Sequence, residues 1–191
     1  MNSDEVLEAF KTYGVLESGH FQLTSGRHSD FYLQKQRLFE YPRLTARLAE
    51  AIVAQFQAGS FDVVASPAVG AILLGGLVAY AADTRFVFTE RDEGGMRLRR
   101  GQTLGIGERV LVVEDIVTTG GSAGEVVRLV EEMGAELTGV AVLADRSMTP
   151  PPFRVTSLLR VEGRDWAPEE CPLCTQGLPI DTPGSRYLAG P

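Results

Sequence analysis

The sequence of 191 residues predicts a single α/β domain with a central, mostly parallel sheet flanked by helices. Two observations predict this fold. Strand-like apolar segments alternate twice with helical segments, and strand, helix, strand is the unit from which parallel sheets are built. The composition, with 44% hydrophobic and 23% charged residues, is that of a globular protein with a packed core.

The N-terminal part is expected to contain two helices with a hairpin between them. Residues 4–13 and 42–57 have helical periodicity, and Pro42 suits a first helical turn. Between them, HFQLTSGRHSDFYLQ is expected to form two short strands around a Ser-Gly-Arg turn. The start of the chain lacks the basic and then apolar order of a signal peptide, so a cytoplasmic protein is expected.

Two strand, helix, strand units follow. The first combines FDVVAS (61–66), a small-residue helix within residues 68–82, too short to span a membrane, and TRFVF (84–88). The second combines RVLVVED (109–115), SAGEVVRLVEEMG (122–134) and ELTGVAVLADR (136–146). In its helix, Ser122 and Glu125 have the spacing of a capping box, and Gly134 suits a C-cap. The irregular sequence after Pro150 is expected to cover one end of the sheet.

A polar, glycine-rich segment, residues 89–108, separates the two units and is expected to be a long exposed loop or a mobile hairpin. Long loops inside compact domains tend to be functional. This segment carries Arg91, Arg97, Arg99 and Arg100. Taken alone, four such arginines are more often a solvated surface than a binding site.

The acidic pair Glu114 and Asp115 stands at the end of an apolar strand, just before TTGGS (118–122). In an open parallel sheet, ligands bind beyond the carboxyl ends of the strands. The backbone N–H groups of a glycine-rich turn and the start of a helix attract a phosphate, whereas carboxylates accept hydrogen bonds from sugar hydroxyls. A phosphorylated ribose would satisfy both parts of the pattern.

Competing phosphate motifs fit this pattern less well. The sequence has no GxxxxGK[ST] motif, and its GIG (105–107) precedes a strand and lacks the third glycine of a dinucleotide fingerprint. In an arbitrary α/β protein the acids could simply end a strand and TTGGS begin a helix, but the whole pattern over residues 110–122 argues against that. A net charge of -7 argues against non-specific nucleic-acid binding.

VLVVEDIVTTGGS (110–122) resembles the phosphoribosyl pyrophosphate (PRPP) motif of the type I phosphoribosyltransferases. FQLTSGRHSDFYL, LADR ending at Arg146 and CPLCTQGLPIDTPGSR resemble the orotate phosphoribosyltransferases within that superfamily. The resemblance implies the type I phosphoribosyltransferase fold, with a core of about residues 42–150 and a small hood from about 14–41 and 151–191.

The resemblance also implies a reaction. The phosphoribosyl group of PRPP would be transferred to orotate, giving orotidine 5′-monophosphate and pyrophosphate in the de novo biosynthesis of pyrimidines (UMP). Mg²⁺ is the implied cofactor, held mainly through PRPP without direct protein ligands. A homodimer is implied, in which residues 90–107 act on the partner's site. Two rivals are a purine salvage phosphoribosyltransferase, against which Arg146 argues, and a nucleotide-sensing RNA-binding regulator, against which the net charge and the arginines argue.

Site residues follow from the same resemblance. Residues 118–122 would hold the 5′-phosphate, Glu114 and Asp115 the ribose hydroxyls, and SPAVG (66–70) the pyrophosphate, in a loop that often contains a non-proline cis peptide. Orotate would be held by Thr118 and Arg146, supported by Phe31 and Tyr32. The implied PRPP-binding set is Ala68, Val69, Gly70, Glu114, Asp115, Ile116, Val117, Thr118, Thr119, Gly120, Gly121 and Ser122.

Physical chemistry supports a simple division of labour in this reaction. Breaking the bond from C1 to pyrophosphate creates an oxocarbenium-like ribosyl group, and orotate is already an anionic nucleophile. The protein must therefore position the reactants and neutralise the departing charge, a task for which arginine is well matched. The implied catalytic residues are Glu114, Asp115, Arg91, Arg99 and Arg100.

The two cysteines of the chain, Cys171 and Cys174, form the motif CPLC. Packing thiols are the favoured interpretation, followed by a redox pair, and a disulfide stays open. A structural zinc site needs four ligands, of which a lone CxxC offers two. His20 and His28 are the only histidines and are distant in the sequence, which argues against zinc.

Overall fold

A computed structural model of the chain describes residues 1–23 and 25–183, so Thr24 and residues 184–191, among them the end of the C-terminal motif, lie outside the described residues. Its core is a six-stranded sheet in the order β5-β4-β3-β6-β7-β8. The strands are β3 (Val63–Pro67), β4 (Arg85–Asp92), β5 (Gly95–Leu98), β6 (Arg109–Val117), β7 (Glu136–Asp145) and β8 (Val155–Arg160). All neighbours are parallel except β4 and β5, which confirms the predicted mostly parallel sheet.

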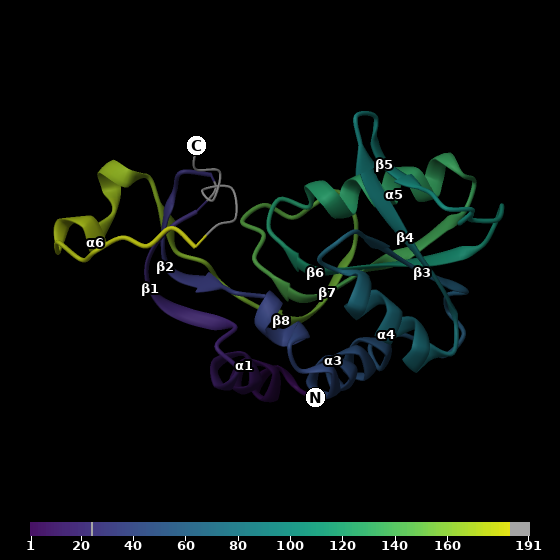
Figure 1. Cartoon of the computed structure of the whole chain (residues 1–191), viewed down its shortest axis with the longest axis horizontal. Helices are drawn as coiled ribbons and strands as arrows, with labels where there is room; N and C mark the ends of the chain where they lie inside the picture. The colour runs from purple at the N-terminus through teal and green to yellow at the C-terminus, as the bar shows by residue number, and fades with distance from the viewer. Residues whose placement is uncertain (24, 184–191) are drawn as a thin grey trace.

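Helices cover both faces of this sheet (Figure 1). On one face, α1 (Ser3–Thr12), α3 (Pro42–Val53) and α4 (Ile72–Ala82) share an apolar cluster with Leu111 and Val113 of β6. On the other, α5 (Gly121–Glu132) packs on Val110 and Val112. Successive side chains of a strand point to opposite faces, so a strand covered on both sides must be apolar throughout. The run Val110–Val113 has this property, and Glu114 is the first residue after it that is only partly buried.

A smaller three-stranded sheet, in the order β1-β2-β9, forms the hood beside the core (Figure 1). The expected hairpin is present, with β1 (Leu16–Gln22) antiparallel to β2 (His28–Leu33). The C-terminal segment adds β9 (Asp165–Trp166), followed by the short helices η1 (Pro168–Glu170) and α6 (Pro172–Thr175). A single turn of helix, α2 (Gln36–Phe39), leads from β2 back to the core.

Three expectations about element boundaries are wrong. α3 ends at Val53 rather than near residue 57. The segment after Pro150 is not entirely irregular, because β8 extends the core sheet to Arg160 and the boundary between core and hood near residue 150 moves accordingly. The proline-rich segment before Val155 made this strand hard to predict from the sequence, and its pairing with β7 stabilises it. β4 extends to Asp92, beyond the expected end at residue 88, and turns into β5. The arginine-bearing segment therefore begins as a hairpin, one of the two forms expected for it (Figure 1).

The predicted capping box at the start of α5 is also wrong. The helix begins at Gly121, and its N-cap is Gly120, with φ 75° and no capping side chain. Ser122 therefore lies inside the first turn, and Glu125 pairs instead with Arg91, Nη1 to Oε2 2.9 Å. The expected glycine at the other end is present, since Gly134 follows the helix with φ 75°.

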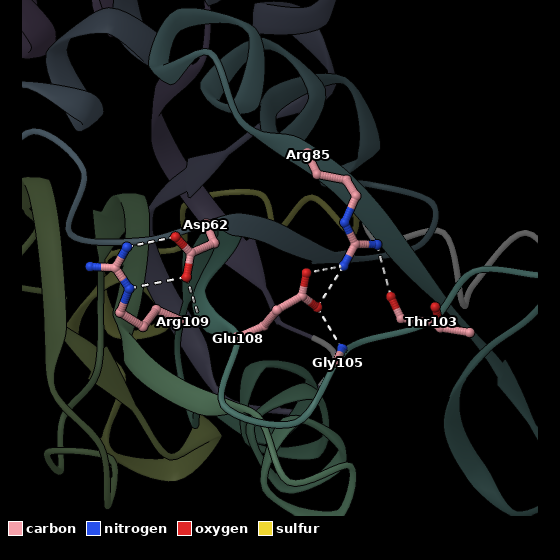
Figure 2. A network of polar contacts seen from close by, with 6 residues as sticks. All are labelled: Asp62, Arg85, Thr103, Gly105, Glu108 and Arg109. Carbon is pink, nitrogen blue, oxygen red and sulfur yellow. Dashed lines mark hydrogen bonds and ion pairs between the residues drawn. The ribbon is translucent and has the colours of Figure 1, made fainter.

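Ion pairs join residues at the amino ends of β3, β4 and β6 (Figure 2). Arg109 Nη2 lies 2.5 Å from Asp62 Oδ1, and Arg85 Nη2 lies 2.6 Å from Glu108 Oε2, which also accepts a bond from the Gly105 amide. Hydrogen bonding from Arg109 lowers the pKa of Asp62. Such exposed pairs stabilise weakly, so they serve mainly to fix where the strands begin.

Among the described helices, none is long and apolar enough to cross a bilayer.

Candidate active site

A pocket of about 220 Å³ opens at the carboxyl end of β6, where the sequence predicted a site. Its lining combines the strand end, the glycine-rich loop, the first turn of α5 and one arginine of β4. These residues are Arg91, Glu114, Ile116, Val117, Thr118, Thr119, Gly120, Gly121, Ser122 and Glu125. The predicted phosphate loop and one of the two predicted acids therefore share one cavity.

Glycine is required at the turn of the loop into α5. Gly120 has φ 75°, and a Cβ there would lie 3.0 Å from Pro151 Cβ and 3.1 Å from Phe153 Cζ. A Cβ at Gly121 would meet only Thr119 Oγ1, at 3.6 Å. Gly120 has no side chain to cap α5, and of the first N–H groups of the helix that of Ala123 contacts Glu114, so those of Gly121 and Ser122 are available to an anionic ligand.

Glu114 lines the pocket as a carboxyl group that titrates near neutrality. Burial, and then the neighbouring charge of Asp115, raise its pKa to about 7, against the opposing effects of Lys35 and the Ala123 amide. Both protonation states are therefore accessible at physiological pH, and a donor supplied by a ligand would favour the ionised form.

Asp115 follows Glu114 in β6 and is almost completely buried, with 1% of its surface exposed. Lys35 Nζ lies 3.0 Å from Asp115 Oδ1 and 2.9 Å from Oδ2, and Oδ1 also accepts the N–H of Ile116 at 2.7 Å. Lys35 comes from the end of the hood hairpin, 80 residues away in the chain. Sequence reasoning missed it, because no local pattern distinguishes a single lysine in a polar segment.

The loop after β3 approaches the same acids. The Ala68–Val69 peptide is cis, Ala68 N donates to Thr89 O at 2.7 Å, and Val69 is 83% exposed. A Cβ at Gly70 would lie 2.9 Å from Asp115 Oδ2. Glycine thus permits the close approach of the predicted pyrophosphate loop to the carboxylate.

Arg146 joins the core to the hood. Its backbone N–H donates to Val117 O at 2.8 Å, and its Nη2 donates to Ser29 Oγ at 3.1 Å. The guanidinium carbon lies 4.5 Å from the centre of the Phe31 ring. Burial lowers the pKa of Arg146, while Asp165 and Asp30 act in the opposite direction.

The two residues predicted to support orotate lie differently in β2. Phe31 contacts Arg146, whereas Tyr32 packs on Phe21, with ring centres 5.7 Å apart, because successive side chains of a strand point to opposite faces. Gly163, unmarked in the sequence, lies against the guanidinium, since a Cβ there would be 3.1 Å from Arg146 Nε.

The hairpin arginines are separated by the structure. Arg91 lines the pocket, whereas Arg99 and Arg100 do not line it and face Glu90 on the hairpin, at 3.9 and 3.0 Å. Hydrogen bonding from Arg100 lowers the pKa of Glu90. Arg97 Nε lies 3.3 Å from Asp92 Oδ2. More than half of the surface of the Arg97, Arg99 and Arg100 side chains is exposed.

Comparisons with known proteins identify the family of this chain. The profile of the phosphoribosyl transferase domain matches residues 36–168. The chain is 44% identical over 190 residues to the orotate phosphoribosyltransferase of Caldanaerobacter subterraneus subsp. tengcongensis, covering 98% of this chain and 100% of the relative. The chain belongs to the orotate phosphoribosyltransferase family. Identity to the enzyme so named from Chlorobaculum parvum is 45%, over 99% of both chains.

The fold of this phosphoribosyltransferase matches that of solved structures. The crystal structure of orotate phosphoribosyltransferase from Aeropyrum pernix superposes with a TM-score of 0.69 at 22% identity, covering 82% of this chain and 94% of that one. This likeness shows the predicted type I phosphoribosyltransferase fold. It does not by itself identify the base that the pocket accepts.

Proposed function

We propose that this chain catalyses the transfer of the phosphoribosyl group from PRPP to orotate, with release of pyrophosphate, in pyrimidine biosynthesis. The observation that carries the proposal is identity of 44–45% over nearly the whole chain to proteins named orotate phosphoribosyltransferase. The pocket chemistry agrees with it, because the predicted phosphate loop shares a pocket with Glu114, and the buried Asp115 follows Glu114 in β6. We place the enzyme in the cytoplasm.

The 5′-phosphate of PRPP would bind at the start of α5. Its oxygens would accept hydrogen bonds from the backbone amides of the loop and from Thr118, Thr119 and Ser122. The ribose hydroxyls would donate to Glu114 and Asp115, and this bonding would favour the ionised form of Glu114. An anionic pair below the ring would then stabilise the positive charge that develops at C1.

Mg²⁺ is compatible with this site as an ion carried mainly by PRPP. Lys35 already pairs with the ionised Asp115, and burial raises the pKa of Glu114, so these acids fit an ion held mainly by PRPP better than direct coordination. Within the described residues, the one cluster of three or more potential metal ligands consists of His20, His28, Cys171 and Cys174 and lies in the hood, not at the pocket. Proteins commonly hold Mg²⁺ through one or two carboxylates together with substrate phosphates. When bound, the ion would offset charge on the pyrophosphate.

Orotate would bind between the core and the hood, where Arg146 offers a positive charge held by Ser29 and Phe31. A half-buried guanidinium favours an anionic base over the neutral bases of purine salvage. As the C1–O bond breaks, its electron pair would leave on the pyrophosphate, and a ring nitrogen of orotate would supply the new bond. We assign Tyr32 only the support of β2, because it packs on Phe21.

A steady-state assay with PRPP, Mg²⁺ and each of orotate, hypoxanthine, adenine and uracil tests the proposal. We expect turnover with orotate and little with the three neutral bases. Asp115→Asn should fold normally and lose turnover by about tenfold to a thousandfold, since it removes anionic stabilisation of the transition state. Turnover of a purine would identify a salvage enzyme instead, and specific RNA binding without turnover would identify a regulator.

We propose a homodimer, supported by α4. Leu73, Leu77 and Tyr80 form one stripe of this helix at helical spacing, and Tyr80 is 84% exposed. A second copy of the chain would cover this stripe. The exposed Arg99 and Arg100 of one subunit could then serve the partner's site, since within one chain they do not line the pocket.

Mixing two defective homodimers tests this arrangement. A chain with Arg99→Ala and Arg100→Ala keeps a sound core, and an Asp115→Asn chain keeps a sound hairpin, yet each homodimer should be weak. If the hairpin acts in trans, heterodimers contain one site without defects and should recover activity towards half of wild type per dimer. Flat activity, despite subunit exchange verified by mass spectrometry, would show that the hairpin serves its own subunit.

A further inference from the structure

Four potential metal ligands converge in the hood, away from the pocket. They are His20 of β1, His28 of β2, Cys171 at the N-cap of α6, and Cys174 within α6. One ligand atom from each lies within 4.8 Å of every other, and His20, His28 and Cys171 are buried. Both cysteines are free thiols.

The separations match a tetrahedral ion at the centre. His20 Nε2 lies 3.1 Å from His28 Nδ1, 3.5 Å from Cys171 Sγ and 3.7 Å from Cys174 Sγ, and Cys174 Sγ lies 3.2 Å from His28 Nδ1. Zn–N bonds of about 2.05 Å and Zn–S bonds of about 2.3 Å at tetrahedral angles place N and N about 3.4 Å apart and N and S about 3.6 Å apart. The four groups therefore already surround a position of the right size.

The second nitrogen of His20 supports the same conclusion. His20 Nδ1 lies 2.9 Å from the carbonyl oxygen of Leu178, which can only accept a hydrogen bond. The proton of the neutral ring is thus on Nδ1, and the lone pair on Nε2 points at the other three groups. Metal-binding histidines are commonly oriented by a bond of this kind from their other nitrogen.

Packing thiols, the interpretation favoured by the sequence, account poorly for this arrangement. Three polar neighbours converge on the single lone pair of His20 Nε2, so at most one of them can donate to it. Each thiol could donate to one histidine nitrogen, but the two nitrogens, 3.1 Å apart, would then face each other as acceptors. An ion at the centre would satisfy all four groups at once.

We propose that His20, His28, Cys171 and Cys174 bind one Zn²⁺ ion in a structural site. Two thiolates and two imidazoles form a set typical of zinc, and four protein ligands leave no open position for catalysis. The sequence argument against zinc fails because the β1–β2 hairpin brings the two histidines together. This proposal does not depend on the assignment of the enzymatic reaction.

The ion would fasten the C-terminal segment to the hairpin. It would add to the backbone bonds that join the two there, among them Asp181 N to His20 O and Gln22 N to Asp181 O, each 2.8 Å. β2 also carries Ser29, which contacts Arg146. His28 and Ser29 are adjacent, so their side chains point to opposite faces of β2. Zinc on one face would thus hold the residues that support Arg146 on the other.

Metal content of the untagged, full-length protein tests the proposal. Elemental analysis after dialysis should find about one zinc ion per chain in the wild type and almost none in Cys174→Ser, whose substitution lies at an exposed position. Glu169→Gln, a nearby exposed change that spares all four ligands, should keep its zinc. Cobalt-exchanged wild type should show the visible absorption of a tetrahedral Co²⁺–thiolate site, and Cys174→Ser should not.

A second measurement distinguishes a zinc site from packing thiols and from a disulfide. Trp166, the one tryptophan of the chain, pairs with His28 between β9 and β2, so its fluorescence should change when a chelator removes the ion and return when Zn²⁺ is restored. The KM for orotate should rise with zinc removal more than the KM for PRPP. A wild-type protein that neither contains nor takes up Zn²⁺ or Co²⁺, or that carries a Cys171–Cys174 disulfide by thiol titration, would overturn the proposal.

Discussion

Replacing Glu114 by Gln should remove a pH dependence from the stability of the ligand-free protein. Burial and Asp115 raise the pKa of Glu114 from its ordinary 4.5 to about 7 in the folded state. Below pH 4.5 the group is protonated in both folded and unfolded chains. Between these values the unfolded chain loses its proton while the folded chain keeps it. The unfolding free energy therefore falls as pH rises from 4.5 to about 7.

The size of the effect follows from the two pKa values. Their difference, at about 1.4 kcal/mol per pH unit, corresponds to a loss of up to about 3 kcal/mol. Glutamine resembles the protonated carboxyl group and does not ionise. Glu114→Gln should therefore match the wild type near pH 4.5 and exceed its unfolding free energy by up to about 3 kcal/mol near pH 8.

Urea unfolding, followed by far-UV circular dichroism at several pH values between about 5 and 8, measures this difference. Glu131→Gln, which removes the same charge from an exposed position of α5, is the control and should follow the wild type. Parallel stability curves for the wild type and Glu114→Gln would refute the argument that burial of Glu114 opposes its ionisation.

The same carboxyl group should control the pH dependence of catalysis. In the proposed complex its ionised form accepts the ribose hydroxyls, so kcat/KM for PRPP should rise with pH through about 7 in the wild type. The inflection should vanish in Glu114→Gln, which is also slower. An unchanged inflection in the variant would assign it to another group.

Three further changes test other parts of the site. Arg146→Ala should raise the KM for orotate by about tenfold to a hundredfold and the KM for PRPP much less, the loss expected for a charge-assisted hydrogen bond; equal effects would make Arg146 structural. Lys35→Met leaves Asp115 buried without its cation and should lower the unfolding free energy at neutral pH by about 1 to 3 kcal/mol in urea titrations, unlike the exposed Lys11→Met. Gly120→Ala, strained by φ 75° and by its neighbours, should destabilise by at least about 1 to 2 kcal/mol and weaken PRPP binding in calorimetry, whereas alanine at the next position should be tolerated.

The sequence by itself determined the central strands of the core sheet and the motif at the end of β6. A buried strand, two acids and a glycine turn into a helix are contiguous over residues 110–122. Their relative positions are fixed by local backbone geometry, so pattern and spacing suffice to place them. The hairpin β1–β2 was readable for the same reason, because its strands and turn are neighbours in the chain.

Only the tertiary structure decided which distant side chains meet. Lys35 reaches Asp115 across 80 residues, Arg146 reaches Ser29 across 117, and Cys171 reaches His20 across 151. The first two contacts depend on how the hood docks on the core, and the third depends on how the C-terminal segment packs on the hairpin, where β9 pairs with β2. No local pattern carries that information, so the sequence could name the phosphate loop but could not assemble the partners of its acids or the four ligands of the hood.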